Sequence, residues 1–125
     1  MFRIVDGRPE LTRGDYAELE VVIKDNEGNV YEMQEGDYLT FSMREFPEET
    51  SALLVQIHSV TNRIIFNHSD TADIDPGLYS ADIQLTTADG KRRTVWCYIP
   101  DDVRKRGQVR NWENFVLLPE VTIDG

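Results

Sequence analysis

The chain has 125 residues, a formal net charge of −10 and a single cysteine, Cys97. This length suits one domain with its own core, a lone cysteine excludes an intrachain disulfide, and the negative charge disfavours nonspecific binding to nucleic acid or to an anionic membrane. No apolar run approaches the roughly 18 residues of a membrane-spanning helix. The first residues lack the pattern of a secretion signal, so we expect synthesis in the cytoplasm.

Short segments of alternating apolar and polar residues follow one another along the chain. A period of two is typical of strands with one buried face. It predicts a short first strand and six core strands, at residues 2–5, 17–23, 39–44, 53–58, 63–67, 79–85 and 94–99. Turn residues separate several of these segments, and the Asp89-Gly90 pair predicts a tight hairpin because it tolerates positive φ.

Residues 69–81 indicate the corner that leads into a late strand of an immunoglobulin-type domain. In such a corner, a tyrosine near the strand start donates its hydroxyl to upstream backbone. The residues expected to form this structural corner are Asp75, Gly77 and Tyr79. One helical turn, capped by Ser69 or Asp70, is expected just before it. The sequence therefore predicts an all-β chain, an immunoglobulin-like antiparallel β-sandwich of about seven strands without a disulfide, plus a C-terminal extra strand or arm.

The expected organisation has two parts. Residues 1–99 form the sandwich, and residues 100–125 contain a basic loop followed by a C-terminal strand or arm. Pro119 removes a ladder donor, so this last segment suits an edge strand or an arm that leaves the sandwich. It packs either on the same domain or on a neighbouring subunit.

Aromatic residues near the end of the chain are the first interface candidates. Alternation places Trp96 and Tyr98 on the sheet face opposite the core. Trp112 and Phe115 either cover that face within the same chain or pack into a neighbouring subunit. Because exposed aromatics often anchor interfaces, all four are assigned to an interface.

Basic residues are concentrated in one segment of this acidic chain. Residues 91–110 hold seven of the thirteen basic residues and only two acids. One interpretation is a solvated hairpin tip and loop. The other is a segment that docks on an acidic surface of a neighbouring copy or partner, with self-association weakening as salt rises. The second interpretation adds Arg104, Lys105 and Arg106 to the interface candidates.

The residues predict no site for chemistry. His58 and His68 belong to no compact set with metal-ligand spacing. The aspartates of residues 70–75 lack the register and closing Glu of a calcium loop, so corner formation explains them better. Cys97 alternates with inward-facing residues and is expected to be buried rather than nucleophilic. We therefore predict no catalytic residues, no metal, no cofactor and no enzymatic activity.

Several segments, taken in order, resemble the N-terminal immunoglobulin-like domain of phage baseplate upper proteins and related prophage structural proteins. The likeness covers most of residues 11–99 and rests on residues 13–17 (RGDYA), 25–28 (DNEG), 33–43 (MQEGDYLTFSM), 75–79 (DPGLY) and the Asp-Gly turn at 89–90 before Thr94. The cysteine pair and the strand tryptophan of antibody domains are missing. No catalytic residue is carried over from this family.

The resemblance implies a structural component of a phage or prophage tail or baseplate, made in the cytoplasm and then incorporated into the virion. Its expected partners are other tail or baseplate proteins or copies of itself, which includes a homo-oligomer. The alternative is a β-sandwich binding module for carbohydrate or another surface ligand that uses its exposed aromatics.

Overall fold

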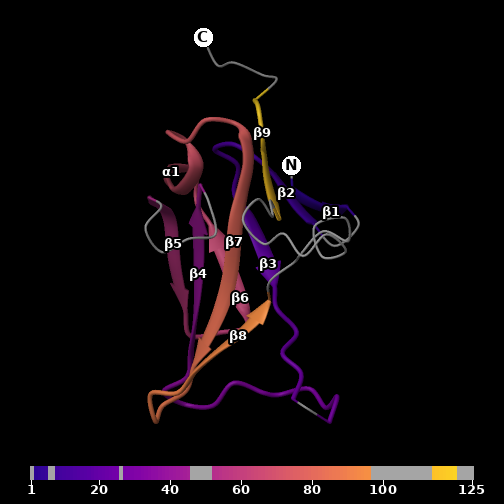
Figure 1. The fold of residues 1–125 in the computed structure, drawn as a ribbon, viewed down its shortest axis with the longest axis vertical. Coiled ribbons are helices and arrows are strands. Elements are labelled where there is room, and N and C mark those ends of the chain that lie inside the picture. Colours follow the sequence, from indigo (N-terminus) through magenta and orange to yellow (C-terminus); the bar gives the residue numbers. More distant parts are fainter. Residues whose placement is uncertain (1, 6–7, 26, 46–51, 97–113, 121–125) are drawn as a thin grey trace, which may run out of the picture.

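The computed structural model describes residues 2–5, 8–25, 27–45, 52–96 and 114–120. These residues form nine strands and one helical turn: β1 Phe2–Val5, β2 Arg8–Thr12, β3 Ala17–Glu20, β4 Tyr38–Arg44, β5 Leu53–Ser59, β6 Arg63–Phe66, α1 His68–Thr71, β7 Gly77–Thr86, β8 Arg92–Trp96 and β9 Phe115–Leu118 (Figure 1). The prediction of an all-β chain is confirmed. Among the described residues, no helix is long and apolar enough to cross a membrane.

Seven of the strands form one sheet in the order β1-β2-β9-β7-β4-β5, with β8 also paired to β7. All of these pairs are antiparallel except β2 with β9, which runs parallel. The expected purely antiparallel arrangement is therefore wrong, and the sheet is mixed. A parallel pair requires a long connection, which the chain supplies because β2 and β9 lie at opposite ends of the sequence.

The remaining strands, β3 and β6, form a separate antiparallel pair. Their apolar side chains share one core with those of the larger sheet. Three fully buried rings meet there, because Phe66 of β6 lies 5.1 Å from Phe41 of β4 and 6.0 Å from Phe115 of β9, between ring centroids. Aromatic pairs at this spacing add to the stabilisation that burial provides.

Strands β8 and β9 lie in line along the same side of β7. Strand β7 pairs β8 at residues 83–86 and β9 at residues 77–79, while β4 occupies its other side (Figure 1). Between the two pairings, the buried Asn114 bonds to the backbone of Ala81. Two short strands and one side chain thus line this side of the long strand β7.

The position of β9 corrects the expectation of an edge strand or a detached arm. It lies between β2 and β7, with partners on both sides in the same chain. Pro119 follows the last strand residue, Leu118, so its missing donor interrupts no ladder bond. Phe115 is fully buried in the core.

Two smaller differences concern element boundaries. Strand β2 was not predicted by alternation, and β3 ends at Glu20 although the side chains of Val21 and Ile23 remain buried. Asn67 occupies the N-cap position of the helical turn. As expected, the Asp70 side chain accepts a hydrogen bond from an exposed backbone N–H, that of Asn67 at 2.7 Å, as in a capping box.

Candidate binding site

The predicted corner is present at the start of β7. The Tyr79 hydroxyl donates to the backbone oxygen of Asp75, four residues upstream. Gly77 is the first residue of the strand, and a Cβ at this position would lie 3.8 Å from the Tyr79 ring. This hydrogen bond is the one expected from the sequence, and it joins the turn after α1 to the strand that follows.

The interface candidates from the sequence do not assemble into one described surface. Phe115 belongs to the core, because β9 pairs inside the sheet, and so it is not an exposed anchor. Trp96 lies in β8 opposite Ile83. Tyr98, Trp112, Arg104, Lys105 and Arg106 lie outside the described residues, as does Cys97.

The histidines have structural partners. His58 Nδ1 lies 3.0 Å from the Thr40 hydroxyl on the neighbouring strand β4. His68 Nδ1 lies 2.8 Å from the backbone oxygen of Gly14. Within the described ranges, no group of three or more His, Cys, Asp or Glu side chains is placed to hold a metal ion.

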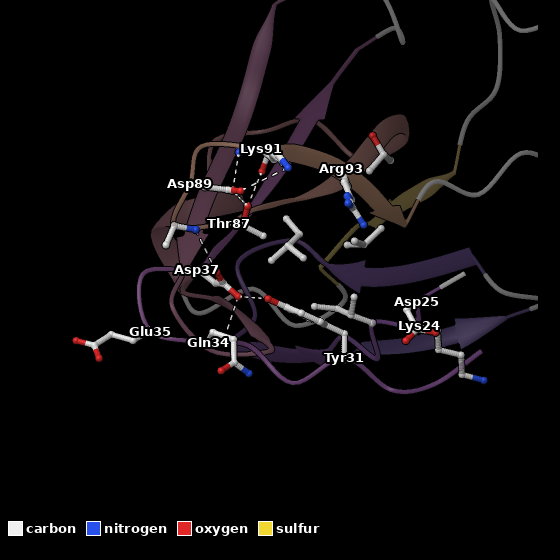
Figure 2. A pocket seen from close by; sticks show the side chains of 15 residues that line it. Lys24, Asp25, Tyr31, Gln34, Glu35, Asp37, Thr87, Asp89, Lys91 and Arg93 are labelled. Carbon is white, nitrogen blue, oxygen red and sulfur yellow. Dashed lines mark hydrogen bonds and ion pairs between the residues drawn. The ribbon is translucent and has the colours of Figure 1, made fainter. Parts of the chain in front are cut away.

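A pocket of about 590 Å³ lies between the segment that joins β3 to β4 and the β7–β8 hairpin. Its volume falls within the range of small-ligand sites. Ile23, Leu85 and Val95 supply apolar lining. Polar and charged side chains, among them Tyr31, Asp37 and Arg93, also line the pocket (Figure 2). Sequence analysis did not predict this pocket, because its walls come from segments about 50 residues apart.

Asp37 joins the two walls of the pocket. Its side chain is only 4% exposed, and Oδ2 accepts from the Tyr31 hydroxyl at 2.5 Å and from the Gln34 backbone at 2.9 Å. Oδ1 accepts from the Ala88 backbone of the hairpin at 3.2 Å. The hydrogen bond from Tyr31 is the main cause that lowers the pKa of Asp37, and the same bond raises the pKa of Tyr31. Three donors therefore hold Asp37 as a carboxylate.

Asp89 organises the hairpin wall in a similar way. Its carboxylate accepts from the Thr87 hydroxyl and from the Lys91 backbone, and it lies 3.7 Å from the Lys91 ammonium (Figure 2). The bond from Thr87 is the main cause that lowers the pKa of Asp89. Gly90 adopts φ 87°, a conformation that suits glycine in this tight turn.

The chemistry of the pocket is that of hydrogen bonding. Its carboxylates Asp37 and Asp89 have lowered pKa values and are weak proton acceptors near neutral pH, while the raised pKa of Tyr31 keeps its hydroxyl protonated. Lys24 and Arg93 also line the pocket and make no ion pair within the described part of the chain. These donors and acceptors beside an apolar patch could orient a polar ligand.

No protein-family model, curated protein or solved structure was found to match this chain.

Proposed function

We propose that this protein is a non-catalytic assembly module of a phage or prophage tail or baseplate that acts through protein–protein contacts. The observation that supports this function is the edge of the larger sheet at β5, which pairs only with β4 among the described residues. Its first two residues, Leu53 and Leu54, are 42% and 36% exposed. Unpaired strand edges and exposed apolar side chains are characteristic of contact surfaces.

The proposal includes an immunoglobulin-like fold. The order β5-β4-β7-β8 beside a separate β3–β6 pair supports this part of the proposal, because immunoglobulin domains also divide their strands between two sheets. The hydrogen bond from Tyr79 to Asp75 adds the corner found in that class. The β1–β2 hairpin and β9 extend the larger sheet beyond this arrangement.

The direct test is to purify tail particles from the organism that encodes the chain and to search them by mass spectrometry and immunogold labelling. We expect the protein in the particles at a fixed ratio to other tail components. An abundant cytoplasmic protein of similar size serves as the control for contamination. Particles that are complete but lack this chain would contradict the proposed function.

A binding module is the second candidate function, supported by the pocket with Arg93 at its wall. A glycan microarray tests it, since carbohydrates use mixed hydrogen-bonding groups beside apolar patches. Arg93→Ala should abolish binding if the pocket is the site. Arg92→Ala removes the same charge from the neighbouring residue of β8, which does not line the pocket, and should leave binding unchanged. Equal losses in both variants would argue against the pocket.

A further inference from the structure

We infer that two copies of this chain associate through strand β5, pairing antiparallel about a twofold axis at Ile57 so that the larger sheets become continuous. This inference rests on the proposed assembly function and names its first partner, a second copy. Three features of the described residues support it: an uncharged edge, a regular backbone stretch and a symmetric arrangement of exposed apolar side chains.

The first feature is the absence of charge on β5. Its seven residues include no Lys, Arg, Asp, Glu or Pro. The other strands with a single described partner, β1, β3, β6 and β8, are only four or five residues long, and the sequence of each contains arginine or glutamate. Such charges oppose edge-to-edge pairing. Strand β5 is therefore the longest and least protected edge in the described part of the molecule.

Absence of charge favours a second copy in particular. In an antiparallel pair about a twofold axis, a charged residue at or next to the axis meets the same charge of the second copy. A chain with a net charge of −10 also repels its copies. The uncharged edge at β5 adds no repulsion between facing side chains to this overall repulsion, whereas the other edges carry charged residues.

The second feature is the regular backbone of residues 55–59. A bulge lies between the Met43 and Arg44 pairings, where Val55 faces Met43 and Leu53 faces Arg44, so Leu54 has no direct partner on β4. Beyond this bulge, five consecutive pairs run without a register shift as far as Ser59. Ile57 is the centre of this stretch, and pairing about it brings Gln56 opposite His58 of the second copy.

The third feature is the position of the exposed apolar residues. Leu54 precedes Ile57 by three residues, and Val60 follows it by three. Their side chains are 36% and 78% exposed. The twofold axis at Ile57 brings the end of β5 that carries Leu54 next to the end of the second copy's β5 that Val60 follows, so each end of the paired strands has an exposed apolar side chain from both copies. This register covers side chains that are otherwise left in water.

Sedimentation equilibrium over a wide range of protein concentration tests the dimer. Leu54→Lys and Val60→Glu each place a charge at both ends of the interface, and each should weaken dimerisation about tenfold, roughly 1.4 kcal/mol. Gln84→Lys is the matched control. It places the same charge on the interior strand β7, at the position that pairs with Thr40, which in turn pairs with His58. This substitution should leave dimerisation unchanged. Loss of the dimer in Gln84→Lys would place the contact on the sheet face and overturn the edge model.

An equimolar mixture of the two variants tests the register. In a mixed dimer, Lys at position 54 faces Glu at position 60 at one end, and the native Leu54 and Val60 meet at the other. We expect the mixture to recover association as a heterodimer, although each variant alone is weakened. No recovery in the mixture would overturn the proposed register. Melting curves of each variant exclude unfolding as the cause, since both substituted side chains are exposed.

Salt separates this contact from the alternative in which the basic segment docks on an acidic surface. Pairing of β5 should strengthen as salt screens the repulsion between two acidic chains, whereas a contact between opposite charges weakens. A wild-type chain that stays monomeric at every concentration and salt level would overturn the inference. The proposed function would survive that result if the protein were still found in tail particles. If the protein forms the dimer in solution but is missing from complete tail particles, the inferred β5 contact stands and the proposed function is contradicted.

Discussion

Asn114 and Ala81 form a reciprocal pair that replaces two backbone hydrogen bonds of the sheet. The Asn114 side-chain oxygen accepts from the Ala81 N–H at 2.6 Å, and its side-chain NH₂ donates to the Ala81 oxygen at 2.7 Å. A primary amide offers one acceptor and donors in the arrangement of a peptide group. Asn114 therefore provides hydrogen-bond partners for the N–H and the oxygen of Ala81, the β7 residue between the pairings with β8 and β9. Both Asn114 and Ala81 are buried.

Replacing Asn114 by alanine should destabilise the protein by about 2–6 kcal/mol. The substitution leaves the N–H and the oxygen of Ala81 buried without partners, at a cost of roughly 1–3 kcal/mol each. Urea unfolding followed by circular dichroism measures the change. Asn62→Ala, at an exposed position in a turn, is the control and should change stability by less than about 0.5 kcal/mol. Similar midpoints for the two variants would contradict the bridging role.

Deleting residues 108–125 should prevent cooperative folding. The deletion removes β9, including the buried side chains of Phe115 and Leu117, and leaves β2 and the start of β7 unpaired on that side. Burial of each such side chain contributes about 1.5–3 kcal/mol, against a total stability of roughly 5–15 kcal/mol for a domain. Deleting residues 121–125 alone retains β9 and is the control. A truncated chain with a native spectrum and a cooperative melt would show that β9 is dispensable.

Tyr79→Phe tests the corner. The variant keeps the ring but loses the hydroxyl that bonds to Asp75, so we expect a loss of about 1 kcal/mol in the free energy of unfolding. Tyr16→Phe removes an exposed hydroxyl that bonds to Glu18 on the surface, and should have little effect. Thermal melts of both variants provide the comparison. Equal melting temperatures would mean that the corner bond adds no stability.

The stability of the protein should fall in acid partly through Asp37. The pKa of Asp37 is lowered in the folded state, chiefly by the hydrogen bond from Tyr31, so its contribution is present above its unfolded pKa of about 3.9. That contribution is lost as pH falls through the lower folded pKa. Asp37→Asn should therefore be less stable than wild type at neutral pH, with a gap that narrows below about pH 4.

Urea midpoints at several pH values measure this gap. Asp73→Asn is the control, because it makes the same substitution at an exposed position on the turn after α1. A stability difference between Asp37→Asn and wild type that stays constant down to pH 2 would show that ionisation of Asp37 does not stabilise the fold.

Sequence patterns predicted the elements that depend on residues close together in the chain, namely strands with one buried face, a tight turn and the corner. Alternation marked the strands from β3 to β8, and Asp89-Gly90 marked the hairpin in which Gly90 takes a positive φ. The corner followed from the spacing of Asp75 and Tyr79. Strand β2 was missed because Pro9 and the charged residues beside it conceal the alternation, although both Pro9 and Leu11 are buried.

Long-range pairing was not accessible in the same way. The last strand was expected at an edge because Pro119 interrupts its apolar run, but its neighbours β2 and β7 lie about 105 and 40 residues earlier in the chain. From the sequence alone, Asp37 likewise has the pattern of a solvent-exposed residue in the segment before β4. Its burial arises when the hairpin brings Ala88 within hydrogen-bond distance, a contact that no local pattern encodes.

The collinear arrangement of β8 and β9 has a consequence for engineering. Because β7 anchors each of them separately, residues 96 and 114 are held at two points on the same side of β7, and β8 and β9 run in the same direction. Additional residues between those anchors would add only a slowly growing closure entropy, about 0.6 kcal/mol for each doubling of length. The ends of a peptide inserted there would therefore be held at two fixed points on β7.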